Sequence, residues 1–527
     1  MKKTLLMLVA FMATMTAFAQ DEQEGWEKSF TPVASASDLA GMCTAVAADG
    51  AVYASSTYDQ AFQFAGKNVK DPEGLLSSCV LKYDKDGNEL WSVSLIGKCE
   101  IHAMTADTDG TLYIAGTSED VTVKVTGTDD NTKEIVNPSA DPYDSGVLSP
   151  TVFSAFIVKI TKEGVVENTT QLTPGTNAEV AASEFPFYME DWDPLTVSPR
   201  GIVICGDKVY VSAAYKGDVK VGDNIIWQGA YVLAYDGMVF ADNRSYGIAS
   251  FSKADLTNAE NAAYIQMKDN KTGEIQNYPE GIGIANNNGK VYASFLGWGN
   301  LNIIGATTKS IEFSLIPGAT SEDNPTIEHG FVLVDLADIE NAQIYHAEGN
   351  TNSYPTYDVA DMAFQDGACI IGGTFYGNLP LKTEITKNVN TSFVASIQMA
   401  DYSVKWATPN EVESYATCMI VTGEEIHAST DAATFTFKTA TGEVKADKTR
   451  NQSYADADVY NDQYASTIYK KDATVYVFSP KMSPSGIEAI KAAAAQGEAK
   501  IYNLNGQRVA TPQKGLYIVN GKKAVIK

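Results

Sequence analysis

Residues 45–55, Ala45-Val46-Ala47-Ala48-Asp49-Gly50-Ala51-Val52-Tyr53-Ala54-Ser55, contain two apolar runs separated by an Asp-Gly pair. Asp-Gly supplies the positive φ angles that a two-residue turn needs, so this stretch predicts an antiparallel hairpin. An apolar strand like its second run, preceded by a turn, occurs six times in the chain, at Val52–Ser55, Leu112–Ala115, Val209–Ser212, Val291–Ser294, Cys369–Gly372 and Ile426–Ser429. The second residue is Tyr in the first four copies, and Ile370 and His427 take its place in the last two.

A second predicted hairpin follows each of these after a gap of variable length. Its first strand begins at Cys79, Phe156, Ile248, Phe331, Phe393 and Ser466, and its second strand carries Trp91, Tyr264, Tyr345, Trp406 and Tyr476 in every copy but the second. Four antiparallel strands repeated several times are the signature of a β-propeller. We therefore predict an all-β chain with one propeller of six or seven four-stranded blades over residues 38–480. The segment 20–37, around Trp26 and Phe30, is expected either to add an edge strand that closes the ring or to belong to a seventh blade.

The copies resemble the secreted bacterial β-propeller repeat family. The family pattern is an apolar residue and Asp-x-x-Gly-x-Tyr-Val, followed by Phe-Val-x-Lys-Tyr-Asp-x-x-Gly-x-x-x-Trp. The first copy matches it best, with Asp49-Gly50-Ala51-Val52-Tyr53 and then Val80-Leu81-Lys82-Tyr83-Asp84-Lys85-Asp86-Gly87-Asn88-Glu89-Leu90-Trp91. The resemblance implies a propeller, and it implies no single activity because the fold hosts many.

Residues 1–19 have the features of a secretory signal peptide. Lys2 and Lys3 form a positive start, Leu5–Met15 is apolar but too short to span a bilayer, and Ala17-Phe18-Ala19 is an A-x-A cleavage site. No other stretch reaches about 18 consecutive apolar residues, so we expect no transmembrane helix.

The C-terminal part is predicted to be a linker over residues 481–498 and a small β tail over residues 499–527. Three short strands are expected there, with breaks at Asn505-Gly506 and Asn520-Gly521. Ile501-Tyr502-Asn503-Leu504, Gly506-Gln507-Arg508-Val509 and Gly515-Leu516-Tyr517-Ile518-Val519 resemble the C-terminal sorting domain of the type IX (Por) secretion system. This resemblance implies a secreted or outer-surface protein of a Gram-negative bacterium that meets its export machinery through the tail. The alternative is a purely structural β tail.

Composition narrows the classes of function. Hydrophobic residues make up 44% and charged residues 20% of the chain, which is ordinary for a globular protein. The net charge of −26 repels phosphate backbones, so we expect no nucleic-acid partner. The chain has only four histidines and contains no G-x-S-x-G, P-loop or H-E-x-x-H motif. Of the six cysteines, Cys79, Cys205, Cys369 and Cys418 fall inside predicted strands, which favours buried free thiols over a disulfide framework.

Two features suggest metal or ligand chemistry but have simpler explanations within the repeat. Asp84, Asp86 and Asn88 place oxygens at alternate positions, as at the start of a calcium loop, although position 95 is Leu where such a loop needs Glu. Turn chemistry explains the same residues, so calcium is expected only as an incidental ion, and we predict no resident cofactor. His427 replaces the repeat Tyr, which favours a packed aromatic ring over a ligand or base.

The insert Glu179–Pro199 is the most suggestive stretch. Tyr188 and Trp192 lie there among several carboxylates, and Trp298 and Tyr357 lie in two other predicted loops. Aromatic rings beside carboxylates suit sugars, which have an apolar face and a rim of hydroxyls. These four residues are our candidate ligand-binding residues. The simpler alternative is a loop that folds its own aromatic rings onto the blade edge.

The sequence thus favours a secreted or surface-exposed binding or scaffold protein with no evident catalytic site. We expect it to bind glycan, peptide or protein through loops on one propeller face, with a cell-surface glycan or protein as partner. The alternative is a secreted polysaccharide hydrolase or lyase that uses paired carboxylates on the propeller face. Whether the protein is an enzyme is left open at this stage, with the non-enzymatic interpretation preferred.

Overall fold

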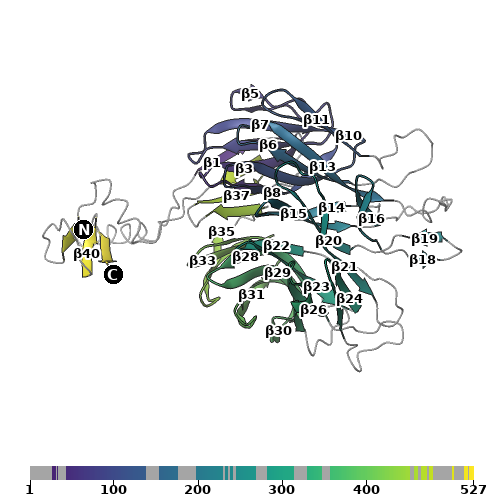
Figure 1. The fold of residues 1–527 in the computed structure, drawn as a ribbon. Coiled ribbons are helices and arrows are strands. Elements are labelled where there is room, and N and C mark those ends of the chain that lie inside the picture. The colour runs from purple at the N-terminus through teal and green to yellow at the C-terminus, as the bar shows by residue number, and fades with distance from the viewer. Residues whose placement is uncertain are drawn as a thin grey trace.

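The computed structural model is built almost entirely of antiparallel strands (Figure 1). It describes residues 26–30, 32–33, 43–137, 154–175, 197–215, 217–229, 232–234, 238–240, 245–268, 282–298, 300–313, 329–346, 357–431, 433–450, 456–460, 464–471, 474–478, 501–503, 515–519 and 522–526. In these residues the strands form seven blades, which we number in chain order. Within a blade, strand 1 is the innermost and strand 4 the outermost of the four. The prediction of an all-β propeller is confirmed, and of the two blade numbers left open the structure shows seven.

The first four blades follow each other along the chain. Blade 1 contains β2 (Thr44–Val46), β3 (Val52–Tyr58), β6 (Ser77–Tyr83) and β7 (Glu89–Ile96). Blade 2 contains β8 (Cys99–Ala106), β9 (Leu112–Ser118), β12 (Ser154–Ile160) and β13 (Val166–Gly175). Blade 3 contains β14 (Val197–Cys205), β15 (Lys208–Tyr215), β20 (Ser245–Ser252) and β21 (Glu260–Lys268). Blade 4 contains β22 (Ile282–Asn287), β23 (Lys290–Trp298), β26 (His329–Asp335) and β27 (Gln343–His346), with a short 3-10 helix η1 (Ile339–Asn341) before β27.

The last three blades complete the ring. Blade 5 contains β28 (Tyr357–Gln365), β29 (Ala368–Leu379), β30 (Lys382–Gln398) and β31 (Val404–Glu413). Blade 6 contains β32 (Ala416–Val421), β33 (Glu425–Thr430), β34 (Thr434–Lys438) and β35 (Val444–Arg450). Blade 7 contains β36 (Asp456–Tyr460), β37 (Tyr464–Lys471), β38 (Thr474–Phe478) and, as its outermost strand, the N-terminal β1 (Glu27–Phe30). The seven innermost strands contact one another in the cyclic order β2, β8, β14, β22, β28, β32, β36 and back to β2.

Hairpins in the chain between strands 2 and 3 of one blade extend the outer edge of the blade before it. β10 (Thr122–Thr126) and β11 (Thr132–Val136) lie in the blade 2 sequence but pair with β7 of blade 1. In the same way β16 (Asp218–Val221) and β17 (Asn224–Trp227) extend blade 2, and β24 (Asn300–Ile304) and β25 (Thr308–Glu312) extend blade 3. Two further small hairpins are β4 (Gln63–Phe64) with β5 (Lys67–Asn68), and β18 (Val232–Ala234) with β19 (Met238–Phe240). Blades 1 to 3 are therefore six strands wide.

The ring closes where the two ends of the propeller chain meet. β1 pairs with β38, with Ser29 opposite Tyr476, so blade 7 takes three strands from the end of the propeller sequence and one from its beginning. The yellow-green β37 contacts β2 at the purple, N-terminal end of the chain (Figure 1). Phe30 also stacks on Phe62 of blade 1, with ring centroids 5.3 Å apart. The prediction that the Trp26–Phe30 region closes the ring or enters a seventh blade is confirmed, since it does both.

One detail of the repeat prediction is wrong. The second hairpin of the sixth copy is not at residues 466–476, because β37 and β38 belong to blade 7. Strand 3 of blade 6 is instead β34, which follows β33 after only residues 431–433. β34 alternates Thr and Phe rather than matching the repeat pattern, so the pattern did not predict it.

The side chains that define the repeat join each blade to the next. From blade 1, Tyr53 OH donates to the Gly110 carbonyl at 2.6 Å, and Lys82 Nζ and Trp91 Nε1 donate to the Lys162 carbonyl at 2.7 and 3.0 Å. Gly110 and Lys162 both lie in turns of blade 2. The Lys82 ammonium lies over the rings of Tyr53 and Trp91, and burial lowers its pKa below the usual value. The motif therefore has an architectural role at this boundary.

Trp26 makes the equivalent contact between blade 7 and blade 1, where the ring closes. Its Nε1 donates to the Lys85 carbonyl of blade 1 at 3.2 Å, as Trp91 does to Lys162 of blade 2. Its indole ring packs on Gly87, where φ is +81° and an added Cβ would lie 2.7 Å from the ring. Gly87 therefore serves both the left-handed turn and the close approach of the indole. The last blade receives its repeat Trp from the N-terminal segment.

The interior packing lies between neighbouring blades. Separate clusters of buried apolar side chains join blades 1 and 2, 2 and 3, 3 and 4, 4 and 5, and 5 and 6. All six cysteines are free; Cys205 is half-buried and the others are buried. Cys79, Cys205, Cys369 and Cys418 lie in strands as predicted. The C-terminal residues form a separate sheet of β39 (Ile501–Asn503), β40 (Gly515–Val519) and β41 (Lys522–Ile526), which confirms a small β tail.

Trp26→Ala is expected to destabilise the propeller by about 2 kcal/mol or more, because it removes the indole from Gly87 and Tyr83 and leaves the Lys85 carbonyl without this donor. Urea denaturation followed by intrinsic fluorescence measures the change. Leu90→Ala, at a side chain 46% exposed, is the control and should shift the midpoint little. Equal midpoints for Trp26→Ala and Leu90→Ala would contradict the closing role of Trp26.

Candidate functional site

The two faces of the propeller differ in the length of their connections. Strands 1 and 2, and strands 3 and 4, are joined on one face by short turns, of which Asp84–Asn88 and Asp107–Thr111 are examples. We call this the turn face. Connections from strand 2 to strand 3 and from each blade to the next lie at the opposite end of the strands, which we call the connection face. The long stretches 138–153, 176–196, 269–281, 314–328 and 347–356 all belong to connections of the second kind.

Two of the four predicted ligand-binding residues, Trp298 and Tyr357, lie at strand ends of the connection face. Tyr188 and Trp192 lie outside the described residues, in the connection from β13 to β14. Trp298 is the last residue of β23, opposite His329, and Tyr357 is the first residue of β28, opposite Phe375. Both strand ends are at the connection face, although the side chains of Trp298 and Tyr357 are outside the described part. Their contact with a ligand stays a prediction.

The calcium candidates Asp84, Asp86 and Asn88 form one turn of the turn face. Asp84 Oδ1 accepts the backbone N–H groups of Asp86 and Asn88 at 2.9 and 2.8 Å, and Asn88 Nδ2 donates to Asp84 Oδ2 at 2.8 Å. The Asp86 carboxylate pairs with Lys85 at 2.7 Å. Hydrogen bonding within the turn accounts for each of these residue types. A bound calcium ion here stays a prediction.

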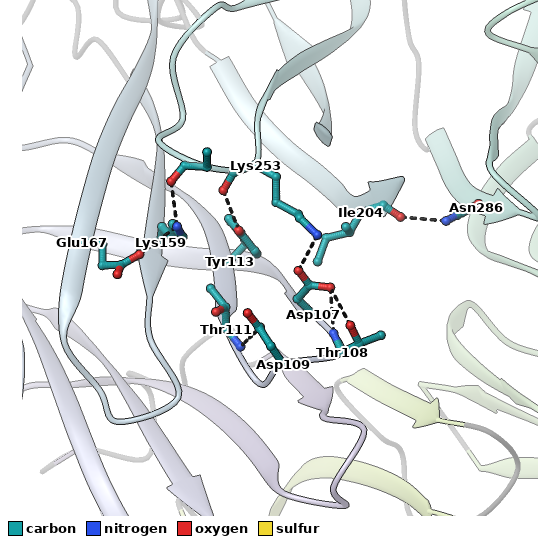
Figure 2. Close-up of polar contacts among 11 residues, drawn as sticks. Asp107, Thr108, Asp109, Thr111, Tyr113, Lys159, Glu167, Ile204, Lys253 and Asn286 are labelled. Carbon is teal, nitrogen blue, oxygen red and sulfur yellow. Dashed lines mark hydrogen bonds and ion pairs between the residues drawn. The ribbon is translucent and has the colours of Figure 1, made fainter. Parts of the chain in front are cut away.

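A charged cleft opens on the turn face between blades 2 and 3 (Figure 2). Its volume is about 560 Å³. Carboxylates and ammonium groups from both blades line it: Asp107, Asp109, Lys159, Asp207, Lys208, Lys253 and Glu260. The repeat Tyr113 lies at its base and donates through OH to the Lys253 carbonyl at 2.8 Å. The turns of the two blades bring these groups together.

The charged groups of this cleft are engaged with each other. Lys253 Nζ pairs with Asp107 at 2.7 Å, and Lys159 Nζ pairs with Glu167 at 2.8 Å and donates to the Ala254 carbonyl at 2.7 Å. Lys208 pairs with Glu260. The Thr111 backbone N–H donates to Asp109, which holds the pKa of that carboxyl below its usual value. The Lys253–Asp107 ion pair and the Lys159–Ala254 hydrogen bond join the two blades, whereas the other two ion pairs lie within one blade. The lowered pKa keeps Asp109 ionised near neutral pH, so this residue does not suit the role of a general acid.

A second polar region lines the central channel. Asp361 on β28 accepts the Met419 N–H of β32 at 2.9 Å, and Asp456 on β36 accepts the Thr44 N–H of β2 at 2.7 Å. Asp458 accepts the Val46 N–H at 2.8 Å. Each carboxyl thus bridges its own innermost strand to that of the next blade. The two bonds from β36 cross the ring closure at its inner edge.

The pKa values of the channel carboxyls Asp361 and Asp456 are raised. Burial raises the pKa of Asp361 to about 7 and that of Asp456 to about 7, and their mutual repulsion and that of Asp458 add to the rise. The backbone N–H bonds act in the opposite direction and are outweighed. The sequence analysis missed all three residues. A visible signal was present at Asp361, a single charge in the apolar strand Val359-Ala360-Asp361-Met362-Ala363-Phe364.

His427 occupies the repeat Tyr position on β33. Its Nδ1 lies 3.2 Å from Thr436 Oγ1, and its Nε2 lies 3.5 Å from Glu425 Oε2. In the described part of the chain, no three His, Cys, Asp or Glu side chains are grouped so that they could hold a metal ion. Nor does any helix of the described residues have the length and apolarity to cross a membrane.

Comparisons with known proteins yield structural likenesses only. No protein-family model matches the chain, and no curated protein matches it. BamB from Moraxella catarrhalis is 11% identical, with a TM-score of 0.34 over 80% of this chain and 98% of that one. The quinohemoprotein alcohol dehydrogenase ADHIIG from Pseudomonas putida HK5 is 11% identical, with a TM-score of 0.37 over 91% of this chain and 82% of that one. At these values neither likeness says what this chain binds.

The channel carboxyls make stability depend on pH in a defined direction. The pKa of Asp361 and Asp456 is about 7 in the folded chain, against about 3.9 for an unfolded Asp, so the folded state holds more protons between these values. Their contribution to the free energy of unfolding is therefore fully present below pH ~4 and lost as the pH rises through about 7. The protein should gain stability from this pair on going from pH 8 to pH 5.

The double variant Asp361→Asn/Asp456→Asn isolates this effect, since the amide oxygen still accepts the same N–H but no longer titrates. We expect the unfolding midpoint of the wild type to rise relative to that of the variant when the pH is lowered from 8 to 5. A difference that stays constant over this range would show that the pair does not titrate as the geometry requires.

Proposed function

We propose that the chain is an exported propeller that binds a cell-surface glycan through its connection face, as a binding or scaffold protein. One observation supports the proposal: the strand ends at Trp298 and Tyr357 lie on the same face as the strand ends that the long connections join. Tyr188 and Trp192 lie in the connection between blades 2 and 3, while Trp298 and Tyr357 end or begin strands at that face. Aromatic rings in long loops on a rigid ring suit the apolar faces of sugars.

The opposite face supports this choice by its construction. Its turns are short. The repeat residues Tyr53, Lys82 and Trp91 form hydrogen bonds there that join blade 1 to blade 2. In the cleft between blades 2 and 3, Lys253 and Lys159 likewise bond across the blade boundary. A face whose side chains hold the ring together has little freedom to adapt to a ligand, whereas the connections vary without disturbing the strands.

The hydrolase or lyase alternative finds less support in the described residues. It needs two carboxyls free to act on a substrate, one of them protonated near neutral pH. Asp361 and Asp456 have the required raised pKa, but each is hydrogen-bonded to the backbone of the next blade. These bonds suit a structural role. A peptide or protein ligand at the same face is the other outcome that the binding experiment must distinguish.

Export is proposed on two features of the sequence. Residues 1–19 have the charge, apolar stretch and A-x-A site of a signal peptide. Residues 499–527 resemble the sorting domain of the type IX system, and β39, β40 and β41 lie within that segment. We propose that the tail addresses the chain to the outer surface of a Gram-negative cell and that the export machinery is the partner of the tail.

Trp192→Ala should weaken glycan binding about tenfold if its ring stacks on a sugar, since one such contact contributes on the order of 1 kcal/mol. The measurement is a glycan and peptide array with residues 20–527, followed by titration of the best saccharide, with a reducing-sugar release assay in parallel. Leu90→Ala, on the turn face, is the matched control and should bind as the wild type does.

Three outcomes would count against the glycan proposal. Sugar release that is lost on replacing one carboxylate would establish a hydrolase instead. Binding to peptides but to no saccharide would move the proposal to a peptide partner. Saccharide binding that Trp192→Ala and Leu90→Ala leave equal would remove the aromatic insert from the site.

Deleting residues 485–527 should leave the folded propeller inside the cell envelope, because the strands of the blades end at Phe478. Fractionation of the native host with an antibody against the propeller measures this, and N-terminal sequencing tests cleavage after Ala19. Unchanged arrival of the shortened chain at the cell surface would reduce the tail to a structural appendage. A mature chain that still begins at Met1 would contradict the predicted leader.

A further inference from the structure

The innermost strands of four blades carry a β-bulge at one shared register. The extra residue is His102 in blade 2, Arg200 in blade 3, Ala360 in blade 5 and Thr417 in blade 6. In each case it lies opposite the fourth residue of the repeat strand and the residue that follows it: Ala115/Gly116, Ser212/Ala213, Gly372/Gly373 and Ser429/Thr430. A bulge re-aims the side chain of its extra residue, so this register is where the channel wall is modified.

Arg200 is the charged member of this set and is exposed. Its strand β14 has β15 on one edge, blade 2 strands β8 and β9 on one face and β22 of blade 4 on the other. The remaining open side is the central channel, near the connection face, because Arg200 is the fourth residue of β14 and that strand starts there. The guanidinium is therefore accessible at the channel mouth.

Arg200 has no acidic partner in the described part of the chain. The ion pairs found there use lysine residues or His427 as the cation, and Arg200 joins none of them. This is unusual for one of only four arginines in a chain with 65 carboxylate side chains. A guanidinium is a planar, permanently charged group whose donors match the geometry of a carboxylate.

His102 is the neighbour of Arg200 from the adjacent blade. Its Nε2 lies 2.8 Å from Thr117 Oγ1, which fixes the imidazole ring. Burial and then the charge of Arg200 lower the pKa of His102 to about 4, so this imidazole is neutral near pH 7. It can offer a hydrogen bond to a ligand but adds no charge of its own.

The channel carboxyls lie away from this pair and do not neutralise it. Asp361 and Asp456 flank blade 6, which in a ring of seven is opposite the boundary of blades 2 and 3. They are bonded to the backbone N–H groups of Met419 and Thr44. Among the described residues, the channel mouth therefore has a cation without an ionic partner on one side and hydrogen-bonded carboxyls on the other.

We propose that Arg200, with His102 beside it, binds the carboxylate of an acidic sugar held at the connection face. A guanidinium binds a carboxylate through two parallel hydrogen bonds, and a single negative charge suffers less repulsion from a chain of net charge −26 than a phosphate dianion does. In the sequence, Arg200 directly follows the insert Glu179–Pro199. This inference rests on the proposed glycan-binding function and names its ligand as a uronate.

The test compares a galacturonic acid trisaccharide with the uncharged galactose trisaccharide of the same linkage, by calorimetry on residues 20–527. Wild type should prefer the uronate. Arg200→Gln should weaken uronate binding about tenfold or more and leave binding of the neutral sugar unchanged, as expected for loss of a charge-assisted contact. Arg200→Lys should recover part of the affinity, because it keeps the charge without the planar fork. Lys124→Gln, at an exposed residue of β10 on the outer edge of blade 1, is the charge-matched control.

The outcomes separate this inference from the proposed function. Equal uronate affinity for wild type and Arg200→Gln, or no preference of wild type for the uronate, overturns the inference, while neutral-sugar binding weakened by Trp192→Ala would still support the glycan face. Failure of both trisaccharides to bind overturns the uronate site. Uronate binding that depends on Arg200 and not on Trp192 supports the site and removes the aromatic insert from it. Thermal unfolding of each variant confirms that the ring is intact.

Discussion

The pairing of β1 with β38 is the constraint on which the rest of this propeller depends. A ring of blades buries both faces of each blade only if the last blade meets the first, and here blade 7 lacks its outermost strand until Glu27–Phe30 supplies it. Trp26 adds the indole that every well-matched repeat places against the glycine of the next turn. Asp456 and Asp458 secure the same boundary from the channel side. Residues at both ends of the propeller sequence must therefore be present before the ring is complete.

The repeat motif explains how the other boundaries are held. Tyr53, Lys82 and Trp91 donate to the carbonyl oxygens of turns in the next blade, and Tyr113 and Lys159 do the same one blade further on. Each donor is polar but largely enclosed by neighbouring blades, so its hydrogen bond is required to offset the loss of water. The residues that make the repeat visible are thus committed to architecture. What distinguishes this chain in function must lie in the connections between the strands.

The central channel shows how a repeated scaffold acquires local chemistry. One bulge register carries Arg200 in one blade and Ala360 or Thr417 in others, with the same strand pairing around it. The bulge recurs at the same register in several blades, whereas the side chain of its extra residue differs from blade to blade. The carboxyls Asp361 and Asp456 illustrate the same freedom: each bridges to the next innermost strand, and enclosure in the channel raises its pKa to about 7.

The sequence by itself determined the fold class, the strand pairs of the first five blades and the small β tail, because Asp-Gly turns and apolar periodicity are local signals. It also pointed to Trp26 and Phe30 as the closing segment. The assignment of β34 failed because its alternation of Thr and Phe does not match the repeat, and the seventh blade needed the pairing of segments more than 400 residues apart, which no local pattern encodes. The candidate aromatic residues were found from composition, but Arg200, His102 and the channel carboxyls were not. Their chemistry arises only when seven innermost strands are brought side by side, since burial, an unpaired charge and a shared register are properties of the ring and not of any one segment.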